Sequence, residues 1–163
     1  MEWTIRPAVF ADFDVIRAIY TRARSFMADN GNPSQWGTSY PPDDLIRQDI
    51  DTGKCYVCIA DGRPAGVFYY AKEEEPTYRV IEGRWENDAP YGVVHRIASS
   101  METKGIASFC LNWAYEQCGN LRIDTHDDNM PMQHLLQKLG FRCCGRIYLA
   151  DGSPRIAFQK SKD

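Results

Sequence analysis

The sequence contains no apolar run long enough to span a bilayer, and none near its N-terminus that resembles a signal peptide. It also lacks an excess of basic residues, because 19 lysines and arginines stand against 22 aspartates and glutamates, for a formal net charge of −3. A membrane-spanning protein and a protein whose main partner is nucleic acid are therefore both disfavoured. We expect a cytoplasmic location, with neither a membrane nor nucleic acid as a partner.

Histidine is scarce, with three in 163 residues, and the six cysteines are not arranged with the spacing of metal ligands. Cys55 and Cys58 form one CxxC, but this pair lies in a strand-like run, where three-residue spacing points the two side chains to opposite faces. The sequence holds no second CxxC or Cys/His pair that could complete a zinc site. We therefore expect no metal, and we interpret the cysteines as buried free thiols in a reducing compartment.

The chain does have enough apolar material for a core, since 44% of its residues are hydrophobic and 12% are aromatic. A chain of this length buries roughly two-thirds of its unfolded surface without disulfides or metals. No internal repeat or domain linker divides it, because the Pro- and Gly-rich segment 32–44 also carries Trp36 and Tyr40 and is typical of a packed loop. We predict a single domain over residues 1–163.

Hydrophobic periodicity predicts a mixture of strands and helices. The expected strands cover residues 4–8, 55–60, 65–71, 93–99, 121–124, 142–149 and 155–159, with a further strand around 78–82. Two helices are expected over residues 12–30 and 106–118. A third is capped by Asp43 or Asp44 and extends to Asp51, and a fourth runs from an N-cap at Asp128 or Asn129 to a stop at Gly140. The acidic run 73–75 is predicted to be a solvated loop or strand end.

The most informative stretch is residues 91–114, which combine an apolar strand, a Gly-containing turn and an amphipathic helix. Residues 101–107 bring backbone N–H groups to a helix N-terminus, where unpaired amides and the helix dipole favour an anionic phosphate. Gly105 and Ala107 leave no side chain in the way of such a ligand. The alternative is a plain strand–turn–helix in which Gly105 merely eases a tight turn.

Two local sequences and the order of the elements resemble the GNAT N-acetyltransferase superfamily over nearly the whole chain, from IRPA at residues 5–8 to IAFQK at 156–160. The phosphate loop of that family usually reads Gln/Arg-x-x-Gly-x-Gly/Ala. Here Glu102, Gly105 and Ala107 occupy these positions, so the small residues match and the first position does not. Residues 128–141, DNMPMQHLLQKLGF, resemble the Asn-containing helix of the family that ends in KLGF.

The resemblance implies an α/β (mixed α+β) fold in which helices flank a central, mixed, mostly antiparallel sheet with a splayed strand pair. It also implies acetyl-CoA-dependent transfer of an acetyl group to a primary amine of a small molecule or a protein by direct attack, and dimers, which the family often forms. The cofactor's pantetheine arm would lie along the splayed strand and its pyrophosphate in the loop after it. The residues expected to bind the cofactor are Ile97, Ala98, Ser99, Lys104, Gly105, Ile106, Ala107, Ser108 and Asn129.

His95 is our candidate for the general base, because it lies on the splayed strand where some family members carry a catalytic histidine. An imidazole has an ordinary pKa of about 6.5, which suits accepting an ammonium proton near neutrality. The alternative is a polar strand residue with an ordinary partner. His126 is the second candidate, and its alternative is a loop residue that fixes the backbone near Asn129.

Leu136 stands seven residues after Asn129, where many family members have a tyrosine that protonates the leaving thiolate. A leucine cannot donate a proton, so we name no general acid. Together with the acidic Glu102 in the phosphate loop, this departure supports an alternative function, a non-catalytic acyl-CoA-binding sensor. A third hypothesis is a cysteine-based redox or zinc protein.

Trp36 and Tyr40 are expected to wall the acceptor pocket, because the first helix and the loop after it border the substrate in the family. Packing in the core is the alternative for either aromatic residue. Glu82 and Trp85, which lie before the splayed strand, are weaker candidates for the same pocket.

Overall fold

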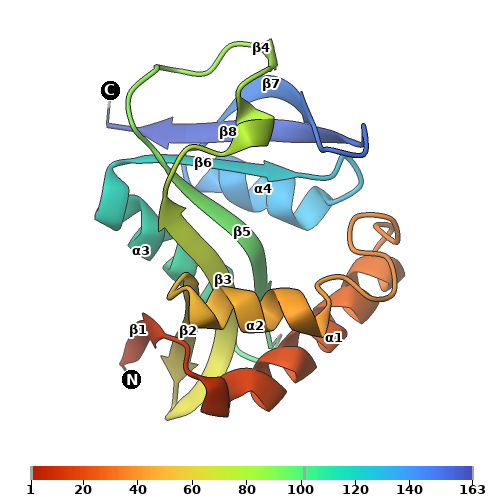
Figure 1. The fold of residues 1–163 in the computed structure, drawn as a ribbon, viewed down its shortest axis with the longest axis vertical. Coiled ribbons are helices and arrows are strands. Elements are labelled where there is room, and N and C mark those ends of the chain that lie inside the picture. Colours follow the sequence, from red (N-terminus) through yellow and green to blue (C-terminus); the bar gives the residue numbers. More distant parts are fainter. Residues whose placement is uncertain (1, 101, 163) are drawn as a thin grey trace.

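The computed structural model describes residues 2–100 and 102–162, and within them helices cover both faces of one eight-stranded sheet (Figure 1). Met101, where the predicted phosphate loop begins, lies outside the described residues. The strands are β1 (Trp3–Pro7), β2 (Cys55–Ala60), β3 (Arg63–Lys72), β4 (Glu82–Gly83), β5 (Gly92–Ser99), β6 (Asn120–Thr125), β7 (Arg142–Tyr148) and β8 (Pro154–Ser161). The helices are α1 (Phe13–Asp29), α2 (Asp43–Asp51), α3 (Ile106–Cys118) and α4 (Met130–Lys138), with 3-10 turns η1 (Phe10–Asp12) and η2 (Pro76–Tyr78).

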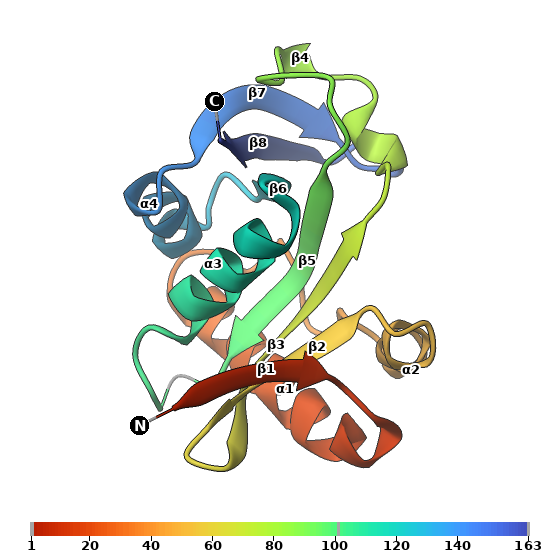
Figure 2. The same ribbon diagram turned by 90° about the vertical axis from the view of Figure 1, so that its left-hand side faces the viewer.

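The sheet is mixed and mostly antiparallel, as predicted. Its strand order is β1-β2-β3-β5-β6-β8-β7-β4, and β5 and β6 form the one parallel pair among the described strands. A parallel pair needs a crossover connection, and α3 provides it. Figure 2 shows α3 and α4 on one side of the sheet and α2 on the other.

β5 and β6 stay together for a short distance and then separate. Their pairing covers Gly92↔Leu121 and Val93↔Arg122, so the described part of β5 beyond Val93 runs without β6 beside it. Its other edge continues to pair with β3, but with a shift in register. The opening between the parallel strands is therefore built into the sheet itself, and it forms the predicted splayed pair.

A β-bulge at Arg96 bends β5 where the opening begins. Tyr69 of β3 pairs with His95 and Val67 pairs with Ala98, so β5 advances three residues while β3 advances two. Arg96 has a φ of +50°, a left-handed conformation that costs free energy for a residue with a Cβ. Two buried contacts stabilise it: the Tyr20 hydroxyl donates to the Arg96 carbonyl at 2.8 Å, and Asp49 pairs with the guanidinium.

Three apolar clusters hold the layers together. The first joins α3 and α4 to one face of the sheet, and the second joins α1 and α2 to the opposite face of β2, β3 and β5. The third surrounds the buried Tyr78 beneath the segment that precedes β5. Gly66 allows α3 to approach β3, because a Cβ added there would lie 2.5 Å from Cγ2 of Ile106. This approach positions the N-terminus of α3 against the sheet.

The structure corrects two predicted element boundaries. The strand expected around residues 78–82 is wrong, because Pro76 and the Glu75 carboxylate, which accepts the Thr77 N–H at 3.0 Å, favour the turn η2 instead. β4 then spans two residues. The expected cap of α2 is also wrong: its N-cap is Pro42, and Asp43 lies inside the first turn.

All six cysteines lie within the described residues and are free thiols. Cys55 and Cys58 pack into clusters on opposite faces of the sheet, as predicted. The expectation that the thiols are buried is confirmed for Cys55, Cys58 and Cys110, while Cys118 and Cys144 are half-buried. It is wrong for Cys143, which is exposed because β7 lies near the edge of the sheet. The described residues contain no cluster of three or more His, Cys, Asp or Glu that could hold a metal ion. Among the helices of this part of the chain, none has the length and apolar character required to cross a bilayer.

Candidate active site

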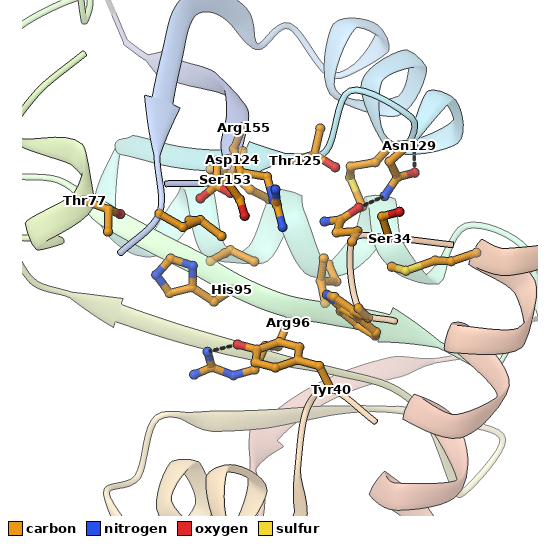
Figure 3. Close-up of a pocket in the computed structure, with 18 of the residues that line it drawn as sticks. Ser34, Tyr40, Thr77, His95, Arg96, Asp124, Thr125, Asn129, Ser153 and Arg155 are labelled. Atoms are coloured by element: carbon orange, nitrogen blue, oxygen red, sulfur yellow. Dashed lines mark hydrogen bonds between the residues drawn. The ribbon is translucent and has the colours of Figure 1, made fainter. Parts of the chain in front are cut away.

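A cavity of about 530 Å³ lies where β5 and β6 separate (Figure 3). The loop after α1 contributes Trp36 and Tyr40 to it, and β5 contributes His95 and Ile97. The remaining walls come from the end of α1, residues 75–77, β6, the start of α4, and the turn before β8 with the start of that strand. A smaller hollow of about 200 Å³ continues along β5 towards α3. The two form one groove, because they share four lining residues: Met27, Ile97, Asn129 and Met132.

A histidine–carboxylate pair faces the larger cavity. His95 Nε2 lies 3.0 Å from Oε1 of Glu75, and each side chain is 19% exposed. The other oxygen of Glu75 accepts hydrogen bonds from the backbone N–H and the hydroxyl of Thr77, at 3.0 and 3.1 Å. The hydrogen bond from His95 is the largest cause that lowers the pKa of Glu75 to about 2. The carboxylate is therefore ionised and fixed in position.

The fixed carboxylate of Glu75 determines which ring nitrogen of His95 carries a proton. An ionised carboxylate only accepts hydrogen bonds, so Nε2 of His95 carries the proton that it donates to Glu75. In the neutral ring this leaves the lone pair on Nδ1, the atom that can accept a proton. The ring packs against Tyr69 with centroids 5.4 Å apart, which holds its plane. His95 is thus arranged as an oriented base.

Trp36 and Tyr40 line the cavity, and both also pack against the protein. Their contact with an acceptor stays a prediction. The Trp36 ring is buried and contacts the Tyr20 ring edge-on, with centroids 5.6 Å apart. The Tyr40 hydroxyl accepts a hydrogen bond from Arg96 at 3.2 Å. Burial alone would lower the pKa of Arg96, but the hydrogen bonds to Asp49 and the negative charge of Asp49 together outweigh it and raise that pKa, so the guanidinium stays charged. The aromatic wall is therefore attached to the bulge of β5.

The N-terminus of α3 lies at the far end of the groove, where Ala107 lines the smaller hollow. Gly105 is the N-cap, with a φ of +89°, and has no side chain that could cap the helix. The first intrahelical bond is from Phe109 N–H to the Gly105 carbonyl, at 3.0 Å. The N–H groups of Ile106, Ala107 and Ser108 precede it and have no partner within the helix. This arrangement is typical of an anion site.

The side chains of the predicted phosphate-loop residues lie in different environments. Ala107 lines the smaller hollow with Ile97, Ala98 and Ser99, while Lys104 is exposed and the Ile106 side chain is buried in the core. Glu102, the residue that departs from the family pattern, points to α1, where its carboxylate lies 2.9 Å from Arg22. This ion pair offsets the charge of Glu102 next to the amides.

Asn129 caps α4 and also borders both hollows. Its Oδ1 accepts the Met132 N–H at 3.2 Å, and its Nδ2 donates to Oε1 of Gln35 at 3.0 Å. The predicted cap is therefore confirmed, and a contact with a ligand stays a prediction. Leu136, on the same helix, has no exposed surface and packs in the core between α4 and the sheet.

Three weaker candidates lie outside the cavity lining. His126 Nδ1 accepts the Asp128 N–H at 3.0 Å, so its alternative as a loop residue holds. The Glu82 carboxylate, on β4, accepts a hydrogen bond from the Tyr148 hydroxyl at 2.6 Å. The Trp85 ring packs against the Arg122 guanidinium. These contacts turn the side chains away from the groove.

Sequence reasoning missed Glu75 and Arg155. Glu75 lies in the acidic run predicted to be solvated, and Arg155 is the second residue of β8, where it is buried and lines the cavity. Both reach the site from segments far from His95 in the chain, so no local pattern could have identified them. A charged residue directly before the apolar run 156–158 was the available signal for Arg155.

A family model described as the acetyltransferase (GNAT) family matches residues 16–141. Among solved structures, a GNAT-family acetyltransferase from Streptococcus agalactiae is 36% identical, covers 99% of this chain and 96% of its own, and has a TM-score of 0.90. A GNAT-family acetyltransferase from Listeria monocytogenes is 20% identical over 98% of this chain and 95% of its own, with a TM-score of 0.71. AAC(6')-Ib in complex with ribostamycin and coenzyme A is 15% identical over 99% and 94%, with a TM-score of 0.64. No curated protein matches the sequence.

Proposed function

This chain belongs to the GNAT acetyltransferase family and transfers an acetyl group from acetyl-CoA to an acceptor amine, and we propose that His95 is the general base of that transfer. The observation that carries the proposal is the pair of His95 and Glu75, at 3.0 Å, on the wall of the cavity between β5 and β6. A non-catalytic sensor would have no use for an oriented base at this position.

The groove fits the cofactor. The smaller hollow is mostly apolar and lies against Ile97, Ala98 and Ser99 of β5, where a strand edge can bind the amides of an extended chain. Beyond it, the amides at the start of α3 suit a pyrophosphate, with Lys104 as a nearby cation. Acetyl-CoA, when bound, supplies a thioester carbonyl for the amine to attack. We propose that the residues that hold it are Ile97, Ala98, Ser99, Lys104, Gly105, Ile106, Ala107, Ser108 and Asn129.

His95 prepares the amine. An amine reacts as a nucleophile only when it is neutral, so its ammonium proton must first be removed. Nδ1 of His95 accepts this proton, directly or through water, and the ring becomes positively charged. Glu75 then stabilises the imidazolium, because its carboxylate already accepts the hydrogen bond from Nε2. Leu136 takes no part in proton transfer, since its side chain is apolar and fully buried.

We propose a small-molecule amine as the acceptor, bounded by Trp36 and Tyr40. A volume of about 530 Å³ is typical of small-ligand sites, and the aromatic wall is tied to Arg96 by the Tyr40 hydroxyl.

We also propose a cytoplasmic location. The six free thiols, of which Cys55, Cys58 and Cys110 are buried, support it.

The function is tested by thiol release from acetyl-CoA across a panel of amines, alongside calorimetry with coenzyme A. We expect binding of coenzyme A and amine-dependent thiol release. Binding without turnover of any amine would favour the sensor, and the absence of binding would contradict the proposed cofactor groove.

A further inference from the structure

Arg155 is a buried cation, and no carboxylate of the described residues forms an ion pair with its guanidinium. Its residue surface is 7% exposed, and it lines the cavity on the wall that faces His95 (Figure 3). Its NH1 donates to the Pro154 carbonyl at 2.8 Å, and within residues 2–100 and 102–162 it forms no ion pair. A guanidinium has five N–H donors, so most of its hydrogen-bonding capacity is unused. An unpaired buried charge is costly unless a ligand compensates it.

The acidic groups around the cavity are already engaged elsewhere. Glu75 binds His95, and Asp124 accepts a hydrogen bond from the Tyr78 hydroxyl at 2.6 Å. Asp151 accepts the Ser153 N–H at 2.9 Å, and its pKa is lowered chiefly by hydrogen bonds from Ser153, with a smaller contribution from the charge of Arg155. Because of these three carboxylates, the charge of the cavity lining around Arg155 is predominantly negative.

A second polar group on the same part of the wall has no partner within the described chain. The hydroxyl oxygen of Thr125, at the end of β6, is buried and forms no hydrogen bond with residues 2–100 or 102–162. Thr125 pairs in register with Ile156, the neighbour of Arg155 on β8, and lines the same cavity. Buried polar groups in proteins are normally satisfied, so two incomplete groups on one wall indicate a place for a polar ligand.

We propose that Arg155 binds a carboxylate of the acceptor, so that the acceptor is an amino acid or a similarly sized amine that carries a carboxylate. This inference rests on the proposed function of the cavity. A planar guanidinium binds a carboxylate with two parallel hydrogen bonds. Because Arg96 is already paired with Asp49, a doubly charged phosphate would meet one available cation and three carboxylates, whereas a carboxylate brings a single charge. The acidic groups then suit the ammonium end of the same molecule.

Matched pairs of acceptors test the charge requirement in the wild-type protein. Each pair consists of an amino acid and its carboxamide, which keeps the shape and the amine but removes the negative charge. We expect kcat/KM for thiol release to be about 10- to 100-fold higher for the amino acid of the best pair. Carboxamides that react as well as the amino acids would overturn the inference and leave the acetyltransferase function intact. A panel in which no amine reacts would overturn both.

Variants locate the effect at Arg155. Arg155→Met should remove the preference within a pair by lowering kcat/KM for the amino acid and leaving the carboxamide nearly unchanged. Arg155→Lys should restore part of the preference, because it returns a cation without the planar donor pair. The control is Arg146→Met, which removes an exposed arginine from β7 that pairs with Asp127. An equal loss toward both members of the pair, with coenzyme A binding retained in calorimetry, would assign Arg155 a structural role and overturn the inference.

Discussion

Nε2 of His95 lies 3.0 Å from Oε1 of Glu75, a residue 20 positions earlier in the chain. The contact joins β5 to the segment that leads into η2. Both β5 and η2 contribute residues to the third apolar cluster. Because Thr77 holds the second carboxylate oxygen, Glu75 cannot turn away without losing two further hydrogen bonds. The pair thus fixes one ring nitrogen of the proposed base and leaves the other for the substrate.

Glu75→Gln should change how stability depends on pH. The pKa of Glu75 is about 2 in the folded protein, against an ordinary value of 4.5, so its contribution is complete above about pH 4.5 and is lost as pH falls toward 2. The wild type should therefore exceed the variant in free energy of unfolding by about 1–2 kcal/mol at pH 6, with a smaller difference at pH 2.5. Urea denaturation at both pH values measures this. Glu74→Gln is the control, because Glu74 is exposed, and a pH-independent difference for Glu75→Gln would contradict the assignment.

Gly105→Glu should weaken cofactor binding through its negative charge. The matched control Gly105→Gln has the same shape and the same backbone strain at a φ of +89°, which costs about 1–2 kcal/mol of stability in both variants. The carboxylate adds a negative charge beside amides proposed to bind a pyrophosphate. Calorimetry with coenzyme A should show at least about a tenfold weaker affinity for Gly105→Glu than for Gly105→Gln. Equal affinities would argue against an anion site at the start of α3.

Asp49→Ala should destabilise the protein strongly. The Asp49 carboxylate accepts hydrogen bonds from Nε and NH2 of Arg96 at 2.9 and 3.0 Å; Asp49 is buried and the Arg96 side chain is 13% exposed. Removing one partner leaves the other charge buried and unpaired, at a cost of about 3 kcal/mol. Asp51→Ala, at the exposed end of the same helix, should change stability little. Chemical denaturation compares the two, and a similar small effect in both would mean that Asp49 does not hold the bulge.

Most helices and strands follow from periodicity, because each is a local pattern of apolar residues meeting one core. The acidic run shows where such reasoning ends. The three glutamates of this run make different contacts. Glu73 binds Lys54 and Tyr69. Glu74 pairs with the exposed Arg79, and Glu75 binds His95. Nothing local distinguishes them, since each partner lies on a different element. The splayed strands and the groove could be predicted only from the resemblance to a family.

Leu136→Tyr should not restore a general acid. Leu136 is fully buried in the core and lies outside the described lining of both hollows, so a tyrosine there would overpack the core rather than reach the groove. We expect a loss of about 1–3 kcal/mol in the free energy of unfolding and no gain in kcat. Denaturation and thiol release on the same preparation measure both. A stable variant with a higher kcat would mean that position 136 faces the thiol.

The pH dependence of kcat/KM in His95→Gln, compared with the wild type, tests the proposed base most directly. Acetyl-CoA affinity is measured by calorimetry on the same samples to separate chemistry from binding. We predict a wild-type rate that falls on the acid side as the base is protonated. In the variant the rate should be at least about 100-fold lower, without that acid limb and with nearly unchanged affinity. A variant with the wild-type pH profile and rate would contradict the account.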